Sequence, residues 1–173
     1  DFGDGFGASP SQVAEAVAAA IDTGIAALSI EDASGVADAP LRPIDDAVAR
    51  LRAARAAIDQ AGGEVLLVGR AENFFVGVPD LRDTLRRLRA YAEAGADVLY
   101  APGISTPEQI RAVVAAAGST PVNLLVGGPT PLNLKDIAAL GVRRVSLGGA
   151  LARAAWGGLI QATRPIVQDG RFD

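Results

Sequence analysis

Cysteine and histidine are both absent from the 173 residues of this sequence. Their absence excludes thiol nucleophiles, zinc sites of the usual kind, Ser-His-Asp triads and imidazole acid–base chemistry. Any catalysis must therefore use carboxylates, arginine, Lys135, tyrosine, serine or asparagine. Because a chain without cysteine is compatible with a reducing compartment, we expect a cytoplasmic location.

Long apolar runs and basic patches are also lacking. Arginine and aspartate interrupt every helix-like stretch, so no segment reaches the roughly 18 apolar residues of a membrane span. The net charge is −4, with arginines scattered among acidic residues, and this pattern gives no support to nucleic-acid binding. Half of the residues are hydrophobic, and we expect residues 1–173 to form a single domain.

The chain alternates between two kinds of segment. Short apolar runs of strand length lie at 25–30, 65–68, 98–101, 122–126 and 144–147. Longer stretches with helical spacing, rich in Ala, Leu and Arg, lie at 11–22, 44–60, 81–94, 107–117, 132–139 and 150–167. Ser9-Pro10 and Thr106-Pro107 have the N-cap hydroxyl and first-turn proline of helix starts.

This alternation predicts an α/β fold with a parallel sheet covered by helices. An open doubly wound sheet and part of a (β/α)8 TIM-type barrel both fit. Polar residues gather at the C-terminal ends of several successive strands, which favours the barrel. A complete barrel needs about 250 residues, and methionine is absent even at position 1, where Asp1 stands. We therefore expect a missing upstream segment that carries the first strands.

The first clear strand ends in two adjacent carboxylates, Glu31 and Asp32. Strand residues alternate between faces, so Leu28 and Ile30 face the outer helices and Glu31 faces the barrel mouth. Asp32 is expected to turn toward the following loop. A strand end that merely meets solvent or an arginine is the alternative for Glu31.

Arg70, near the end of the next strand, lies at the level of Glu31. Its guanidinium is suited to hold a substrate carboxylate or phosphonate through two parallel hydrogen bonds. A structural ion pair with Glu31 or Glu72 is the alternative.

Further candidates flank these two strands. In the opening "DFGDGFG", Asp1 and Asp4 precede a Gly-Phe-Gly turn, and carboxylates that converge without His or Cys suit Mg²⁺. A simple turn is the alternative for this motif. Asn123, near a later strand end, is a candidate to orient a substrate oxygen. The segment "ASGVADAPLRP" is predicted to form a mobile lid, in which Ser34 is a candidate substrate contact.

Six motifs, in order, resemble the isocitrate lyase/phosphoenolpyruvate mutase superfamily, particularly its phosphonomutase-like members: "DFGDGFG", "GIAALSIEDASG", "VGRAENF", "AGADVLYAPG", "PVNLLVGG" and "RVSLGGALARAAWG". The resemblance implies a (β/α)8 barrel of which this chain covers about strands 4 to 8. It also implies a homodimer or homotetramer, often with the last helix exchanged between subunits. Such enzymes bind Mg²⁺, with Mn²⁺ as a substitute, and form or break a C–C or P–C bond beside a carbonyl through a metal-stabilised enolate.

Carried over by position, Asp1 matches the acid that ligates Mg²⁺ directly, and Glu31 matches an acid that holds the ion through water. Arg70 matches the arginine that contacts the acidic group of the substrate. The sequence also departs from the family. Its opening motif has Gly3 in place of a second acid, and on a regular strand this change puts Asp4 on the opposite face from Asp1. Either Asp4 reaches the ion because the turn has begun, or the metal shell has one carboxylate fewer. The loop after Asp32 lacks the cysteine of the isocitrate lyases and the lysine and asparagine of the mutase gating loop.

These departures leave three functions open. The leading hypothesis is an Mg²⁺-dependent lyase or phosphonomutase that acts on a small 2-oxo acid or a related phosphonate. The second is an oxaloacetate-type hydrolase or decarboxylase on the same scaffold. The third is a non-catalytic oligomeric member of the family.

Overall fold

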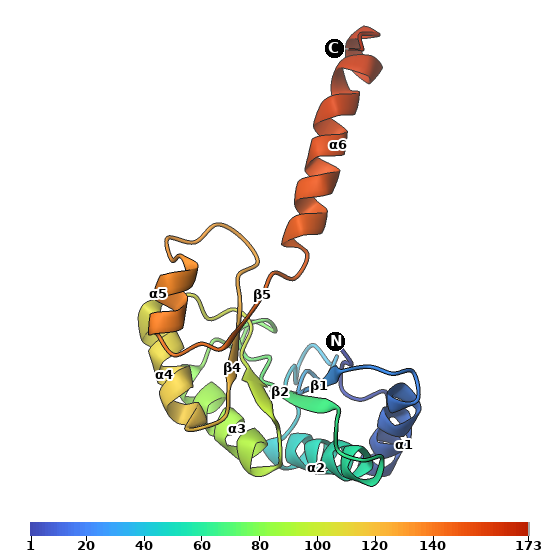
Figure 1. The fold of residues 1–173 in the computed structure, drawn as a ribbon, viewed down its shortest axis with the longest axis vertical. Helices are drawn as coiled ribbons and strands as arrows, with labels where there is room; N and C mark the ends of the chain where they lie inside the picture. Colours follow the sequence, from blue (N-terminus) through green and yellow to red (C-terminus); the bar gives the residue numbers. More distant parts are fainter. Residues whose placement is uncertain (173) are drawn as a thin grey trace.

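The computed structural model describes residues 1–172, and the helices and strands alternate along them as the sequence predicts (Figure 1). The elements are α1 (Pro10–Ile21), β1 (Ala27–Glu31), α2 (Ile44–Gln60), β2 (Leu66–Arg70), α3 (Leu81–Glu93), β3 (Val98–Tyr100), α4 (Pro107–Ala117), β4 (Val122–Leu125), α5 (Leu134–Ala139), β5 (Arg144–Ser146) and α6 (Ala150–Asp169). Every predicted segment is confirmed, with bounds that differ by a few residues.

The predicted helix starts are confirmed in atomic detail. The Ser9 hydroxyl accepts a hydrogen bond from the Gln12 backbone amide, and the Gln12 side-chain oxygen accepts one from the Ser9 backbone amide. Thr106 and Gln109 form the same capping box at α4, and a proline follows each cap. Two otherwise unpaired backbone donors are satisfied at each helix start.

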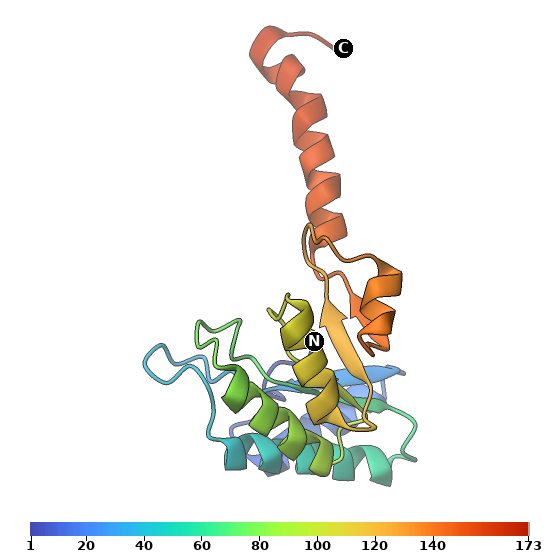
Figure 2. The same cartoon turned by 90° about the vertical axis from the view of Figure 1, so that its left-hand side faces the viewer.

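The five strands form one parallel sheet in the order β1-β2-β3-β4-β5. Because each strand pairs with the one before it in sequence, every crossover runs in the same direction and its helix falls on the same face. Figures 1 and 2 show α1 to α5 arranged around one side of the strands. This winding is that of a TIM-type barrel, since a doubly wound sheet reverses its strand order and carries helices on both faces.

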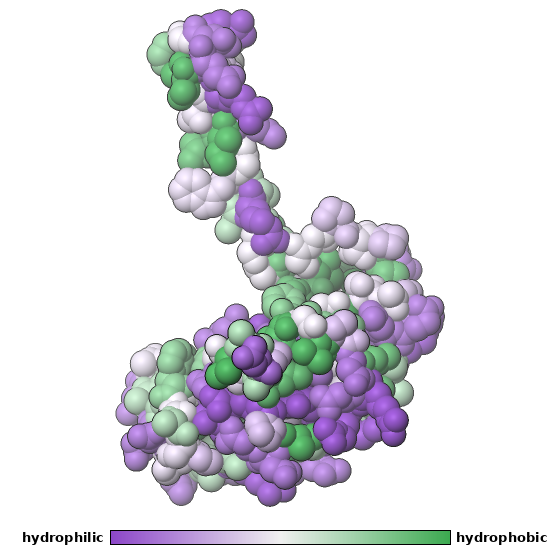
Figure 3. All heavy atoms as spheres, turned by 180° about the vertical axis from the view of Figure 1, so that it is seen from behind, coloured by the Kyte–Doolittle hydropathy of each residue, from purple (hydrophilic) through white to green (hydrophobic). Residues whose placement is uncertain are grey.

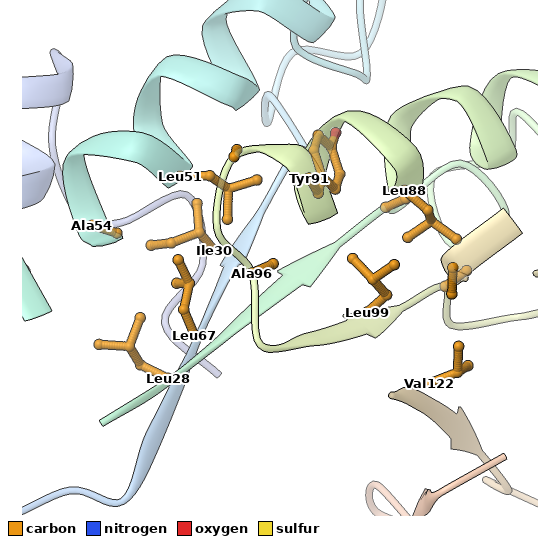
Figure 4. Close-up of a cluster of buried hydrophobic side chains, with 14 of the residues drawn as sticks. Leu28, Ile30, Leu51, Ala54, Leu67, Leu88, Tyr91, Ala96, Leu99 and Val122 are labelled. Atoms are coloured by element: carbon orange, nitrogen blue, oxygen red, sulfur yellow. The ribbon is translucent and has the colours of Figure 1, made fainter. Parts of the chain in front are cut away.

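The hydrophobic core fills the space between this sheet and its helices (Figure 4). Leu28 and Ile30 are buried there, as the strand alternation predicts. Gly69 of β2 pairs with Ile30, and a Cβ at this position would lie 2.9 Å from the Cβ of Tyr91. The absent side chain lets α3 approach the strand closely and brings Tyr91 over the end of the sheet.

Helix α6 extends away from the rest of the chain (Figures 1 and 2). None of its described residues is buried, and its apolar side chains are visible on the surface in Figure 3. Trp156 is 64% exposed and Leu159 is 51% exposed. No helix among residues 1–172 is both long and apolar enough to span a membrane.

Candidate active site

One registered row of polar and aromatic residues crosses the whole sheet. It lies at the carboxyl ends of β1, β2 and β3, at the second residue of β4 and at the first residue of β5. The aligned residues are Glu31, Arg70, Tyr100, Asn123 and Arg144. Cross-strand partners in a parallel sheet point to the same face, and these side chains alternate with the residues that pack against the helices. The row therefore lies on the face that would be the interior of a barrel.

Arg70 is the electrostatic centre of this row and is only 9% exposed. Its Nη1 lies 3.1 Å from Asp1 Oδ1 and also 3.1 Å from Glu31 Oε1, and its Nε donates to Glu72. The guanidinium carbon lies 5.1 Å from the centre of the Tyr100 ring, within cation–π range. The structure thus brings Asp1, Glu31 and Arg70 together, and it also contains the ion pairs that were the structural alternative.

The opening segment is attached to the outer edge of β1 beside this centre. The Glu31 amide donates to the Gly3 carbonyl at 2.8 Å, and the Phe2 amide donates to Ser29 Oγ at 3.2 Å. Ser29 Oγ lies 3.2 Å from Glu31 Oε1, to which it donates. These contacts hold Asp1 next to Glu31.

Glu72 is the third carboxylate on Arg70 and is 4% exposed. Burial raises the pKa of Glu72 above its ordinary value, although the hydrogen bond and positive charge of Arg70 oppose the rise. The negative charges of Glu31 and Asp32 also raise this pKa. Protonation of Glu72 is therefore easier than that of an ordinary glutamate.

The sequence led us to expect Asp32 to turn toward the following loop. In the structure it is instead 1% exposed, and both of its carboxylate oxygens accept hydrogen bonds. Its Oδ2 accepts from Arg87 Nη1 at 3.0 Å and from the Tyr91 hydroxyl at 2.5 Å. Its Oδ1 accepts from the Glu72 amide at 2.7 Å. One carboxylate therefore joins the ends of β1 and β2 to α3 and fixes the backbone next to Arg70.

Arg87 connects Asp32 to Asp83, near the start of α3. Its Nε donates to Asp83 Oδ2 at 2.6 Å, and Asn73 donates to the same oxygen at 3.0 Å. Burial would raise the pKa of Asp83, but hydrogen bonds from Arg87, Asn73 and Arg86 lower it to about 2. Sequence reasoning missed this network because Asp32, which joins it to the strand end, is 55 positions from Arg87.

The Asp4 carboxylate lies in a different ion cluster. It pairs with Arg42 and lies 3.9 Å from Arg50 Nη1. Arg50, which is 2% exposed, also donates to the backbone carbonyls of Asp4 and Gly7 at 3.1 and 2.7 Å. Asp4 therefore contacts Arg42 and Arg50, whereas Asp1 contacts Arg70.

Ser34 is engaged within its own loop. Its hydroxyl donates to the Ala39 carbonyl and accepts from the Val36 amide at 2.9 Å. An antiparallel bridge between Ala33 and Leu41 closes the base of the same loop. The hydrogen bonds that the structure describes for the Ser34 hydroxyl are therefore within its own loop and not with the residues around Arg70.

Asn123 is completely buried, and its side-chain amide forms hydrogen bonds with two neighbours. Arg144 Nη1 donates to Asn123 Oδ1 at 3.0 Å, and Asn123 Nδ2 donates to Ser146 Oγ at 2.9 Å. Arg144 was not identified from the sequence. Its position in the register of β5 was the signal that could have found it.

The carboxylates of Asp1 and Glu31 fit a hard divalent cation that takes only one or two ligands from the protein. Among residues 1–172, no three or more His, Cys, Asp or Glu side chains are arranged to hold a metal ion. Asp1 and Glu31 nevertheless direct one oxygen each toward the same Arg70 nitrogen, so these oxygens are no farther apart than twice 3.1 Å. Mg²⁺ commonly keeps several waters and is held by one or two carboxylates together with its substrate.

Comparisons with known proteins identify the family of the chain. The family model described as phosphoenolpyruvate phosphomutase matches residues 1–167. An oxaloacetate decarboxylase of Bradyrhizobium sp. (strain ORS 278) is 33% identical over 155 residues, which are 85% of this chain and 51% of the relative. The chain thus spans about half the length of this curated relative.

Solved structures extend the likeness to three dimensions. A candidate lyase/mutase from Burkholderia cenocepacia J2315 matches with a TM-score of 0.94 and 47% identity, over 99% of this chain and 62% of the other. A 2,3-dimethylmalate lyase, described as a member of the PEP mutase/isocitrate lyase superfamily, matches with a TM-score of 0.87 and 26% identity, over 99% and 60%. The chain therefore belongs to the phosphoenolpyruvate phosphomutase family of the PEP mutase/isocitrate lyase superfamily.

Proposed function

We propose that the protein is an Mg²⁺-dependent enzyme of lyase or phosphonomutase type that acts on a small 2-oxo acid or a related phosphonate. The observation that carries the proposal is the approach of two carboxylates, Asp1 and Glu31, to one nitrogen of Arg70 at 3.1 Å each. Two carboxylate oxygens that can bind a hard cation thus lie next to the guanidinium of Arg70, which can bind an acidic group of the substrate. Membership in a family of mutases and lyases supports the same class of reaction.

In this proposal Arg70 and Glu31 are the catalytic residues. Arg70 binds the carboxylate or phosphonate of the substrate, Asp1 would hold Mg²⁺ or Mn²⁺ directly, and Glu31 would hold it through water. When bound, the ion would supply Lewis-acid stabilisation of negative charge on the substrate. Asp4 as a ligand and Ser34 as a substrate contact stay predictions, since each would have to leave its present partners.

Cleavage of oxaloacetate by hydrolysis or decarboxylation is the second candidate function. It is favoured by the 33% identity to a relative named oxaloacetate decarboxylase. The two candidates use the same site, because each breaks a bond beside a 2-oxo acid and needs the same electrostatic stabilisation.

We further propose that this chain supplies strands 4 to 8 of a cytoplasmic (β/α)8 barrel and forms part of that one domain. The one-directional winding of the sheet supports this assignment. So does the opening segment, whose Gly3 carbonyl bonds the free edge of β1 in the manner of a preceding strand.

Product release from a substrate panel tests the proposed function. With the full protein, pyruvate or oxalate should form from oxaloacetate or a related acid, or phosphoenolpyruvate should form from phosphonopyruvate, only when Mg²⁺ or Mn²⁺ is present, and EDTA should abolish the reaction. Glu31→Gln should raise the Mg²⁺ concentration needed for half-maximal rate about tenfold or more, because one ligand charge is lost. The exposed Glu64→Gln is the matched control.

Two results would contradict the function. Release that is unaffected by EDTA would exclude the metal dependence. The absence of both turnover and calorimetric binding of Mg²⁺ with oxalate would favour a non-catalytic member.

We also propose that α6 packs on a neighbouring copy of the chain in a homodimer or homotetramer. Its exposed apolar residues, such as Trp156 and Leu159, support this arrangement. Sedimentation velocity should show an oligomer that Leu159→Glu dissociates, whereas the exposed Gln161→Glu on the same helix should leave it intact. A wild-type protein that is monomeric at micromolar concentration would refute the arrangement.

A further inference from the structure

We propose that Tyr100 is a catalytic proton donor of the same site, whose hydroxyl protonates the carbon atom that is left when a C–C bond of a 2-oxo acid breaks. This inference rests on the proposed function and adds to it the residue that supplies the proton. It concerns the cleavage of C–C bonds, because the isomerisation of a phosphonate forms no new C–H bond.

Tyr100 lines a cavity that is also lined by Asp1, the proposed metal ligand. The cavity has a volume of about 170 Å³, whereas pockets for drug-sized ligands are typically about 300–1,000 Å³. It therefore suits a metabolite of a few carbon atoms. The centre of the Tyr100 ring lies 5.1 Å from the guanidinium carbon of Arg70. A substrate held between Asp1 and Arg70 would consequently lie beside Tyr100.

The two tyrosines of the chain use their hydroxyl groups differently. Tyr91 is completely buried, and its hydroxyl donates to Asp32 at 2.5 Å. The Tyr100 hydroxyl forms no hydrogen bond within the part of the chain that the structure describes. Nor is it one of the fully buried side-chain atoms of residues 1–172 that lack a partner, so it is open to solvent. Tyr100 thus has a hydroxyl proton available for a ligand in the cavity.

Other candidate proton donors of the chain are engaged or distant. Ser29 donates its hydroxyl proton to a carboxylate oxygen of Glu31 at 3.2 Å, and Glu72 is paired with Arg70. Lys135 is exposed on α5, in the outer layer of helices (Figure 1). Cysteine and histidine are absent. Tyrosine is one of the side chains that act as general acids in enzymes, and Tyr100 combines this chemistry with an unpartnered hydroxyl at the cavity.

Oxaloacetate illustrates the proposed step. Its C3–C4 bond breaks, C4 leaves as CO₂, and the bonding electrons form the enolate of pyruvate. The proton of the Tyr100 hydroxyl then moves to C3 while the C2 carbonyl forms again. The tyrosinate takes a proton from water, which restores the enzyme without an oxidant or a reductant. Because Tyr100 lies on one side of the substrate, C3 receives the new proton on one face only.

Turnover of oxaloacetate by the full protein with Mg²⁺ tests this role, after subtraction of the rate without enzyme. Tyr100→Phe keeps the ring and removes only the hydroxyl. It should lower kcat for pyruvate formation about 10²-fold or more, the contribution typical of one general acid. The KM and the calorimetric affinity for oxalate with Mg²⁺ should stay within about threefold of the wild type. Since the lost hydroxyl has no partner among residues 1–172, Tm should change by less than about 2 °C.

The configuration of the product separates proton donation from a structural role. With oxaloacetate that carries one deuterium at C3 in a defined configuration, turnover in tritiated water should give pyruvate with a methyl group of one configuration. The residual turnover of Tyr100→Phe should give a racemic methyl group, because solvent then protonates both faces. Tyr91→Phe is the matched control: it removes the other tyrosine hydroxyl and should lower stability, since Asp32 loses a donor, but its product should keep the single configuration.

Failure of this inference is distinguishable from failure of the function on which it rests. If Tyr100→Phe gives product of a single configuration, at whatever rate, Tyr100 is not the proton donor. A racemic product from the wild type would overturn the inference as well. If the wild type converts phosphonopyruvate but not oxaloacetate, the proposed function stands and this inference fails. If the wild type neither turns over an acid of the panel nor binds oxalate with Mg²⁺, the proposed function fails first.

Discussion

Arg70→Gln should lower kcat/KM about 10²- to 10³-fold, the loss typical when one stabilising donor is removed from an active site. The reason is geometric as well as electrostatic. Arg70 is 9% exposed and faces the two carboxylates proposed to hold the cation. Glutamine cannot present two parallel N–H groups with a positive charge to the acidic group of a substrate. Steady-state kinetics over the substrate panel measure the effect.

Arg70→Lys separates a substrate-binding role from a purely structural one. If Arg70 only balances the charges of Glu31 and Glu72, lysine keeps the charge and should restore at least a third of the activity. If Arg70 holds the substrate through its planar fork, lysine should remain within about tenfold of the glutamine variant. The exposed Arg52→Gln on α2 controls for a general loss of positive charge and should retain wild-type rates.

Magnesium affinity gives an independent check of the same residue. Arg70 Nη1 competes with a cation for Asp1 and Glu31, since it lies 3.1 Å from both. Arg70→Gln should therefore bind Mg²⁺ at least as tightly as the wild type while turning over more slowly. Weaker Mg²⁺ binding in this variant would mean that Arg70 holds the carboxylates in place, contrary to the assignment made for it.

The sequence was sufficient to predict the elements and the face on which Glu31 and Arg70 lie. Strand alternation placed Leu28 and Ile30 toward the helices, and the structure buries both. These positions follow from the period of the strand, which is local. Asp4 pairs with Arg42, but Gly3 and Asp4 lie in a turn, with a φ of 52° at Gly3, so strand alternation does not explain its separation from Asp1.

Features that depend on partners distant in the chain could not be predicted. Asp32 contacts Tyr91 across 59 positions and Arg87 across 55. Arg144 joins the row only because β5 pairs in one particular register with β4. Period alone does not reveal which helix lies over a strand end or which register a strand adopts, since packing of the whole core sets both.

The second large effect concerns stability: Asp32→Ala should lower the free energy of unfolding by about 3–5 kcal/mol, as is usual when one partner of a buried charge pair is removed. The substitution leaves Arg87 charged and buried without this carboxylate, and it removes the acceptor of the Tyr91 hydroxyl. Burial and the negative charge of Asp32 raise the pKa of Tyr91, which reflects the same contact between Asp32 and the Tyr91 hydroxyl. Urea unfolding measures the change, and Asp38→Ala in the neighbouring exposed loop is the control.

Asp32→Asn tests whether charge or only hydrogen bonding matters at this position. The amide can still accept one bond but carries no charge, so Asp83 is left as the paired carboxylate of Arg87, and a loss of about 1–3 kcal/mol is expected. Because Asp32 also accepts from the Glu72 amide at 2.7 Å, the loss should bring lower activity, even at temperatures where the variant is fully folded. A variant that is destabilised yet fully active would show that Asp32 supports the fold without positioning the strand end that carries Arg70. An alanine variant within about 1 kcal/mol of the wild type would refute the structural role itself.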